Sequence, residues 1–146
     1  MADESLRSVD IERSSAGRYV VRNARGGTIS IGTGKDDDFT PVELLLAALG
    51  GCSAVDVDLV TSRRAEPDEF RVRVTGDKIR DETGGNRMRN LRVEFAVAFP
   101  DGPAGDAARE AVPRTMRLSH DRICTVSRTV EAGTPVELSQ RSASEQ

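Results

Sequence analysis

The pattern of apolar and polar positions along the chain begins with three short alternating segments. They are residues 6–13 (LRSVDIER), 18–23 (RYVVRN) and 27–32 (GTISIG). Alternation with a period of two, together with β-branched residues, is typical of strands. The glycines of the ARGG stretch before the third segment suit a tight hairpin turn. We therefore expect an antiparallel meander at the start of the chain.

The most apolar segment follows and reads TPVELLLAALGGCSA, residues 40–54. Thr40 can cap a helix, Pro41 suits the first helical position, and Glu43 completes a capping box. The positions after Glu43 are apolar on nearly all sides, which is typical of a helix buried on more than one face. The pattern predicts a central helix that runs to about Arg64.

The second half of the chain predicts two more strands, a helix and a last strand. Residues 70–76 (FRVRVTG) and 91–99 (LRVEFAVAF) alternate apolar with polar positions, and the charged segment between them is expected to be a loop. We expect the two strands to form a hairpin or a long-looped antiparallel pair. Helical spacing returns over residues 105–118, where Pro113 is expected to kink or split the helix. A final strand is expected around residues 134–140 (TPVELSQ).

Composition narrows the class of protein. The chain has 146 residues and 15.8 kDa, which suits a single domain with its own core. Its 21 basic and 24 acidic residues are interspersed, and aromatic residues are scarce, so neither a nucleic-acid surface nor a stacking platform is indicated. The apolar run Leu44 to Leu49 is too short to span a bilayer, and the N-terminal sequence MADESLRS does not resemble a signal peptide. We expect a soluble cytoplasmic protein with no membrane partner, and a disordered tail over residues 141–146.

The two cysteines, Cys52 and Cys124, are the sharpest chemical feature. Gly50 and Gly51 precede the first, and each costs roughly 1 kcal/mol in a helix interior, so we expect them to give another backbone or a ligand clearance beside the thiol. In a reducing compartment the two thiols are either buried small hydrophobes or a redox pair, and the spacing leaves both open. His120 is the only histidine and no CxxC is present, so we expect no metal and no cofactor.

Two motifs together carry a family resemblance. TPVELLLAALGGCSAVDVDLV at 40–60, followed by HDRICTVSRTV at 120–130, resembles the OsmC/Ohr family of thiol-dependent hydroperoxide-reducing proteins. The order of predicted elements fits over about residues 7–138. The resemblance implies one OsmC-like domain over residues 1–146 with an α+β fold, in which antiparallel sheets surround a long buried central helix. It also implies an intertwined homodimer with active sites at the subunit interface.

The resemblance further implies a thiol peroxidase activity. Cys52 would be the peroxidatic thiol that attacks an organic hydroperoxide, and Cys124 would resolve the product through an intramolecular disulfide. A dithiol reductant such as a lipoylated protein would then recycle the disulfide. Physical chemistry adds that an apolar pocket raises a thiol pKa, so a cation is needed beside the thiolate. Asp56, one turn after Cys52, would act in the opposite direction if the two share a helix face.

The other functional residues of the family, an arginine and a carboxylate, can be matched to this sequence, and the carboxylate is displaced by one position. The arginine that the family's N-terminal strands supply to the thiolate matches Arg18, with Arg25 as the second candidate. In the family's best-known peroxidases the carboxylate that orients this arginine directly follows a proline, where this chain has Val42. Glu43 stands one residue later, which turns a helical side chain by about 100°. Glu43 is therefore either a catalytic residue or only the helix cap, and the general OsmC-like branch is the better match.

A second function stays open from the sequence. The same fold could serve as a non-catalytic dimer that binds a small hydrophobic ligand, with its cysteines merely buried, or as a thiol redox sensor. Reactivity of the thiols toward an alkyl hydroperoxide separates these readings.

Overall fold

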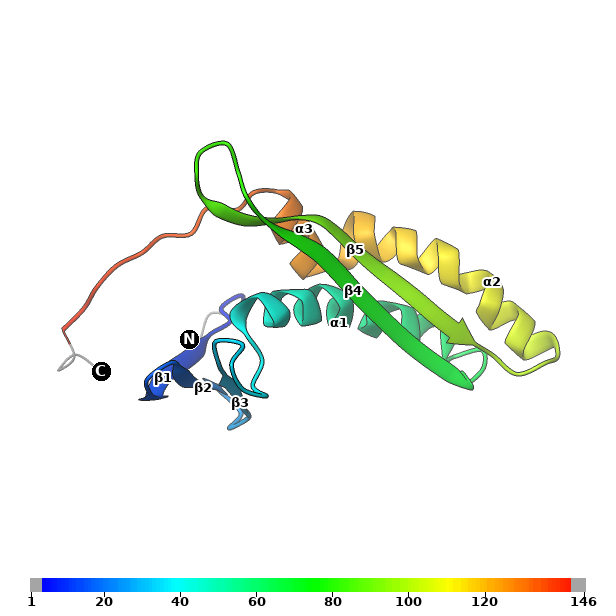
Figure 1. Cartoon of the computed structure of the whole chain (residues 1–146). Helices are drawn as coiled ribbons and strands as arrows, with labels where there is room; N and C mark the ends of the chain where they lie inside the picture. Colours follow the sequence, from blue (N-terminus) through cyan, green and yellow to red (C-terminus); the bar gives the residue numbers. More distant parts are fainter. Residues whose placement is uncertain (1–3, 143–146) are drawn as a thin grey trace. The chain divides into compact units, whose positions relative to one another are not determined.

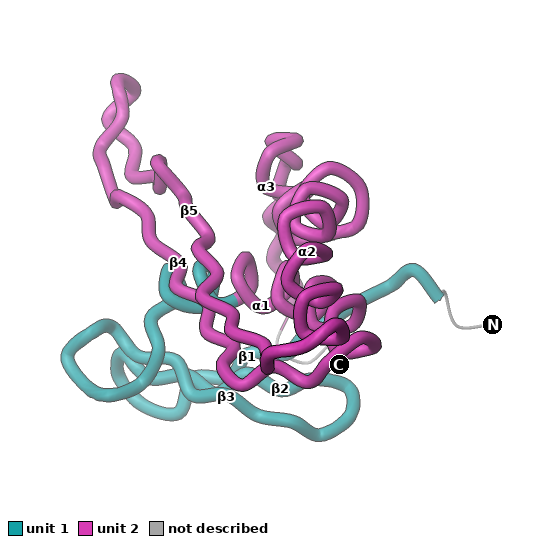
Figure 2. The backbone as a smooth tube through the Cα atoms, turned by 90° about the vertical axis from the view of Figure 1, so that its right-hand side faces the viewer, with its two compact units in different colours: residues 1–47 teal, residues 48–146 magenta. Residues whose placement is uncertain are grey.

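The computed structural model describes residues 4–142 and divides the chain into two compact units, coloured separately in Figure 2. The first unit ends at Ala47 and the second begins at Ala48, so the division falls inside the long helix α1. The single domain predicted for residues 1–146 stays a prediction. Of the predicted disordered tail, residues 143–146 lie outside the described part, and the two residues before them have no regular secondary structure.

The first unit contains the predicted meander. Strands β1 (Val9–Ser15), β2 (Arg18–Asn23) and β3 (Thr28–Ile31) form an antiparallel sheet in the order β1-β2-β3. The β2–β3 turn is held by the Asn23 side chain, whose Oδ1 accepts a hydrogen bond from the Gly27 amide at 2.9 Å. The three predicted strands are thus confirmed.

Helix α1 (Pro41–Thr61) begins at the predicted capping box. The Glu43 amide donates to Thr40 Oγ1 at 3.2 Å, and the Thr40 amide donates to Glu43 Oε1 at 2.9 Å. The Thr40 amide and hydroxyl lower the pKa of the Glu43 carboxyl. The helix ends earlier than predicted, because after Thr61 the chain tightens and the Arg64 amide donates to the Thr61 carbonyl at 3.0 Å.

Within one chain, α1 buries a single face. Its buried residues are Leu49, Gly50, Val57 and Thr61. On other faces the apolar side chains Val55 and Leu59 are 67% and 57% exposed. The helix therefore carries more apolar surface than its own chain covers.

Helix α1 is also long and apolar enough to cross a membrane, with a mean hydropathy of 1.7 over its most apolar window. It is the one such helix among the described residues. Length and composition alone are weak evidence for a span, because the core helix of a globular protein has the same character. The structure thus contains no clear membrane-spanning segment in its described part.

In the second unit, strands β4 (Glu69–Arg80) and β5 (Asn86–Ala98) form an antiparallel hairpin. The predicted antiparallel pairing is confirmed in its hairpin form. The loop predicted for the charged segment is wrong, since both strands continue through it to a short turn. There Asp81 Oδ1 accepts from the Thr83 hydroxyl at 2.6 Å and from the Gly85 amide at 3.2 Å, which closes the turn. Helices α1 and α2 lie on one side of this hairpin (Figures 1 and 2).

Helix α2 (Pro103–Leu118) is continuous, so the predicted split at Pro113 does not occur. It passes directly into a single π-helical turn, η1 (Ser119–Ile123), and then into the short helix α3 (Thr125–Glu131). Sequence reasoning did not predict α3.

The last strand predicted for residues 134–140 is wrong, because this stretch has no regular secondary structure. Val136 and Leu138 are 85% and 92% exposed, so their alternation is not used to cover a core. An alternating pattern forms a strand only where a neighbouring strand and an apolar face are available to it.

The β4–β5 hairpin explains the first glycine of the Gly50-Gly51 pair in α1. A Cβ on Gly50 would overlap Cγ2 of Val74 and lie 3.4 Å from Cγ1 of Val72, both on β4. A Cβ on Gly51 would meet nothing within 4 Å among the described residues. Gly50 therefore lets α1 approach β4 closely, whereas Gly51 is not required by this contact.

We expect Gly50→Ala to lower the free energy of unfolding by about 1–3 kcal/mol, because the stiff Val74 side chain cannot move aside without repacking. Gly51→Ala is the matched control and should leave it unchanged or raise it by up to about 1 kcal/mol, the helix preference of alanine over glycine. Denaturant unfolding of both variants measures the difference. Equal losses at the two positions would contradict the close approach.

Candidate functional site

Cys52 and Cys124, far apart in sequence, lie side by side in the second unit. Cys52 projects from α1, and Cys124 stands at the junction between η1 and α3. Both are free thiols. The Cys124 side chain helps to raise the pKa of Cys52, and the Cys52 side chain helps to lower the pKa of Cys124.

Cys124 is fully buried and surrounded by hydrogen-bond donors. Its sulfur caps α3, accepting from the Ser127 amide at 3.4 Å, and it lies 3.3 Å from the Ser127 hydroxyl. The Ser53 hydroxyl donates to the same sulfur at 3.8 Å. Burial raises the pKa of the Cys124 thiol, but the bonds from Ser127, Cys52 and Ser53 outweigh it, so the net pKa is lowered.

Cys52 differs in both exposure and acidity. Its side chain is only partly buried, so it is the more accessible thiol of the pair. Burial is the main reason why the pKa of Cys52 is raised, followed by the neighbouring Cys124. The backbone amides of Val126 and Thr125, in the first turn of α3, act in the opposite direction. The pKa values of the two thiols are thus shifted in opposite directions, that of Cys52 upward and that of Cys124 downward.

The π-helical turn positions Cys124 against α1. The Cys124 amide reaches back to the Ser119 carbonyl at 2.7 Å, which closes the turn. The buried Ser119 hydroxyl in turn donates to Asp56 Oδ2 at 2.7 Å. Asp56 lies one helical turn after Cys52, so one stretch of α1 holds both the thiol and the anchor of the segment that carries its partner. Single π-helical turns of this kind are frequent at functional sites.

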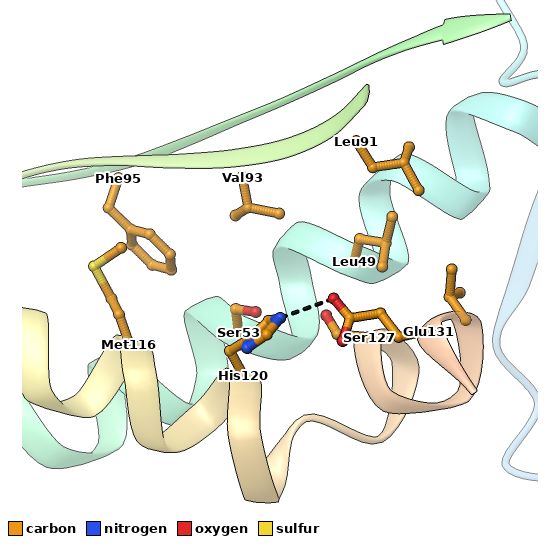
Figure 3. Close-up of a pocket in the computed structure, with 10 residues that line it drawn as sticks. Leu49, Ser53, Leu91, Val93, Phe95, Met116, His120, Ser127 and Glu131 are labelled. Carbon is orange, nitrogen blue, oxygen red and sulfur yellow. Dashed lines mark hydrogen bonds and ion pairs between the residues drawn. The ribbon is translucent and has the colours of Figure 1, made fainter. Parts of the chain in front are cut away.

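A cavity of about 270 Å³ lies near Cys124, and the residues that line it include neither Cys124 nor Cys52 (Figure 3). Apolar side chains form most of its wall, and its polar residues are Ser53, Ser127, His120 and Glu131. Ser53 and Ser127 are the residues whose hydroxyls lie against the Cys124 sulfur. The cavity is thus separated from that sulfur by two serine side chains.

His120 bridges two carboxylates beside this cavity. Its Nδ1 lies 2.9 Å from Asp121 Oδ1, and its Nε2 lies 2.8 Å from Glu131 Oε1, the contact drawn in Figure 3. The hydrogen bond with Asp121, followed by that with Glu131, raises the pKa of His120. The imidazolium form is therefore favoured at the polar end of the cavity.

The other predicted site residues belong to the first unit. Arg18 forms an ion pair with Asp36, Nη2 to Oδ2 3.2 Å, and a longer one with Asp38. The Arg25 amide donates to the side chain of Asn23 in the β2–β3 turn. Glu43 serves the capping box described above. The catalytic roles of Arg18, Arg25 and Glu43 stay predictions.

Sequence reasoning missed the polar residues around the thiols. Ser127 follows Cys124 by three positions, which is the spacing between an N-cap residue and the backbone amide that donates to its side chain. This spacing was the one available signal. The sequence analysis considered His120 only as a possible metal ligand, and it did not consider Glu131. Among residues 4–142, no group of three or more His, Cys, Asp or Glu side chains is arranged to hold a metal ion.

Comparison with known proteins defines the class first. The fold is that of the OsmC-like proteins: an OsmC-like protein from Mycoplasma pneumoniae superimposes with a TM-score of 0.68 at 13% identity, covering 88% of this chain and 89% of the other. The organic hydroperoxide resistance protein OhrB of Bacillus subtilis superimposes with a TM-score of 0.54 at 16% identity, covering 86% and 90%.

The sequence comparisons then fix the family. Residues 34–139 match the family model described as OsmC-like protein. An uncharacterized protein of Mycobacterium tuberculosis is 31% identical over 130 residues, which cover 88% of this chain and 91% of the relative. The chain belongs to the OsmC family, as the two cysteine motifs predicted.

We expect Ser127→Ala to raise the pKa of the Cys124 thiol, because the thiolate loses the hydroxyl beside it while its burial is unchanged. Ultraviolet titration of thiolate absorbance in a Cys52→Ser background measures this pKa alone. Since the pKa moves up, the absorbance step should shift to higher pH. Ser127→Thr, which keeps a hydroxyl, should titrate like the parent, and an identical curve for Ser127→Ala would contradict the assignment.

Proposed function

We propose that the protein is a cysteine-based peroxidase that reduces organic hydroperoxides, with Cys52 as the attacking thiol and Cys124 as the resolving thiol. The observation that carries this proposal is the pairing of two free, interacting thiols beside a largely apolar cavity. An apolar cavity admits the organic part of a hydroperoxide, and two adjacent thiols supply the two electrons for its reduction.

The first step breaks the peroxide bond. The Cys124 thiolate takes the proton of the Cys52 thiol. The Cys52 thiolate formed in this way attacks the terminal oxygen of ROOH. The S–O bond forms as the O–O bond breaks, which gives Cys52–SOH and RO⁻, and RO⁻ takes a proton from water to become the alcohol. The two thiols titrate as a coupled pair, so neither pKa belongs to one sulfur alone. The lower pKa of Cys124 is therefore compatible with attack by the more accessible Cys52.

The second step forms the disulfide. The Cys124 thiol attacks the sulfenic sulfur of Cys52, the S–S bond forms, and water leaves with the thiol proton. A dithiol reductant, such as a lipoylated protein, then returns both cysteines to thiols and is itself oxidised to a disulfide. The cycle needs thiols that are kept reduced between turnovers, which suits a cytoplasmic location.

We further propose that the active form is a homodimer in which Arg18 supplies the cation for the Cys52 thiolate and Glu43 orients that arginine. The exposed Val55 and Leu59 on α1 support an interface, because a helix with apolar side chains on several faces needs a second covering surface.

Light scattering at micromolar concentration should therefore give twice the chain mass of 15.8 kDa. Val55→Arg should shift the protein toward the monomer, because a charge would be buried in the interface. Glu82→Arg, in the exposed β4–β5 turn, is the control and should stay dimeric. A monomer mass for the unaltered protein would rule the dimer out.

Stoichiometric alkyl hydroperoxide should convert the two thiols into one intramolecular disulfide that dithiothreitol reverses. Cys52→Ser should abolish peroxide consumption. Cys124→Ser should complete one turnover and leave a sulfenic acid on Cys52, which a cyclic 1,3-dione traps for mass measurement. If Cys124 carries the trapped adduct in Cys52→Ser instead, the two roles are reversed.

The second candidate function is ligand binding without catalysis, which the apolar lining of the cavity favours. The same experiment distinguishes it: both thiols would then alkylate fully after excess hydroperoxide. A redox sensor would form the disulfide but would not turn over with the dithiol.

A further inference from the structure

Asp56 is the acidic residue one helical turn after Cys52, and the peroxidase cycle proposed above gives it no role. Its carboxylate is half-buried, and its Oδ2 accepts a hydrogen bond from the Ser119 hydroxyl at 2.7 Å. Ser119 is only 1% exposed, so its hydroxyl has to find a partner inside the protein. The Asp56 carboxylate supplies that partner and thereby joins α1 to the π-helical turn η1.

Ser119 is fixed through all of its polar groups. Its backbone amide donates to the carbonyls of Thr115 and Met116 in the last turn of α2. Its carbonyl accepts from the Cys124 amide at 2.7 Å, and its hydroxyl donates to Asp56. One buried residue therefore connects the end of α2, the side of α1 and the backbone of the second cysteine.

The π-helical turn determines which residue lies against α1. In an ordinary α-helix the residue four positions after Ser119, which is Ile123, would lie on the same face. The π-helical hydrogen bond spans five positions instead, and it brings Cys124 to that face. Accordingly Ile123 is 50% exposed, whereas Cys124 is fully buried. Since Asp56 follows Cys52 by one turn of α1, anchoring Ser119 at Asp56 holds Cys124 beside Cys52.

We propose that Asp56 and Ser119 are positioning residues of the resolving step, and that their hydrogen bond holds Cys124 in register with Cys52. The kinetic part of this inference rests on the peroxidase proposal above, which includes neither residue. A disulfide forms only within a narrow range of Cα separations and dihedral angles. A displacement of about 1 Å can slow such a reaction by about a hundredfold. A loosened π-helical turn would therefore leave the thiols chemically intact but slow to join.

Substitutions at Asp56 separate the hydrogen bond from the charge. Asp56→Asn loses the charge but keeps an acceptor oxygen, so disulfide formation should stay within about threefold of the parent. Asp56→Ala loses both, and the disulfide should form about ten- to a hundredfold more slowly. Asp58→Ala, which removes an exposed carboxylate two residues further along α1, is the matched control and should behave like the parent.

The double variant Asp56→Ala/Ser119→Ala tests whether the two residues act through one bond. It should form the disulfide no more slowly than Asp56→Ala, because the second substitution removes nothing that the first has left in place. It also leaves no buried hydroxyl without a partner, which favours folding. If Asp56→Ala does not fold, the double variant takes its place in the comparison with Asp56→Asn.

The first measurement is the lifetime of the Cys52 sulfenic acid after one equivalent of cumene hydroperoxide. Samples are quenched with a cyclic 1,3-dione at increasing times, and the mass of the protein gives the fractions of sulfenic acid and disulfide. Timing begins once the peroxide is spent, so a change in the rate of the first step does not enter the result. The sulfenic acid should last about ten to a hundred times longer in Asp56→Ala than in Asp56→Asn.

The second measurement needs no peroxide and uses the equilibrium of the Cys52–Cys124 disulfide with reduced and oxidised glutathione. The equilibrium constant for closing the disulfide should fall by about ten- to a hundredfold in Asp56→Ala and should stay near the parent value in Asp56→Asn. A loss of fold stability alone would not be reversed by asparagine, which restores the acceptor but not the charge.

Two results would overturn the inference while the peroxidase proposal stands: Asp56→Ala could match the parent in both measurements, or Asp56→Asn could be as impaired as Asp56→Ala. If the unaltered protein does not consume the hydroperoxide, the peroxidase proposal fails, and the glutathione equilibrium alone decides the positioning role. An unaltered protein that forms no disulfide with glutathione would contradict the positioning role as well.

Discussion

The helical repeat of α1 is the constraint on which the site depends. Leu49, Ser53 and Asp56 recur at the spacing that brings residues to one side of a helix. The first lines the cavity, the second donates to the Cys124 sulfur, and the third anchors the π-helical turn through Ser119. Because these contacts share one rigid element, the thiol pair and the cavity keep a fixed relation to each other.

The thiol pair is stabilised by neutral donors within its own unit. The hydroxyl and amide of Ser127 and the hydroxyl of Ser53 oppose the cost of burying a charge on Cys124. Oriented dipoles that need no counter-ion can hold a thiolate in this way, as they do at helix N-termini in general. In the proposed peroxidase mechanism a cation would then have to act only on Cys52, because burial raises the pKa of that thiol.

Local chemistry made much of the fold predictable. The capping box of Thr40 and Glu43 and the strand alternation of the meander depend on neighbours in sequence, so they could be read directly. The family and its α+β fold followed from the two cysteine motifs. The misassigned parts depend on distant partners. The charged segment that the sequence analysis assigned to a loop lies mostly within β4 and β5, because the backbones of the two strands pair with each other along it.

The polar part of the site was unpredictable for the same reason. The spacing of Cys124 and Ser127 was a local signal for a helix cap, but the contacts of Ser53 with Cys124 and of His120 with Glu131 form only in the folded chain. The tail around Val136 shows the converse case, in which a strand-like pattern finds no partner and stays irregular. The cavity could not be inferred from sequence, since its wall is assembled from five elements: α1, β5, α2, η1 and α3.

The capping role of Cys124 has a consequence for folding. Helix α3 has only seven residues, far fewer than the about 12–15 that an isolated helix needs to be even marginally stable. Its first turn is held by the sulfur that accepts the Ser127 amide. Any change in what that sulfur is bonded to therefore shifts the order of a helix that carries Val130 and Glu131 of the cavity wall. The oxidation of the Cys124 sulfur and the shape of the neighbouring cavity are therefore thermodynamically linked, so that a shift in one equilibrium shifts the other.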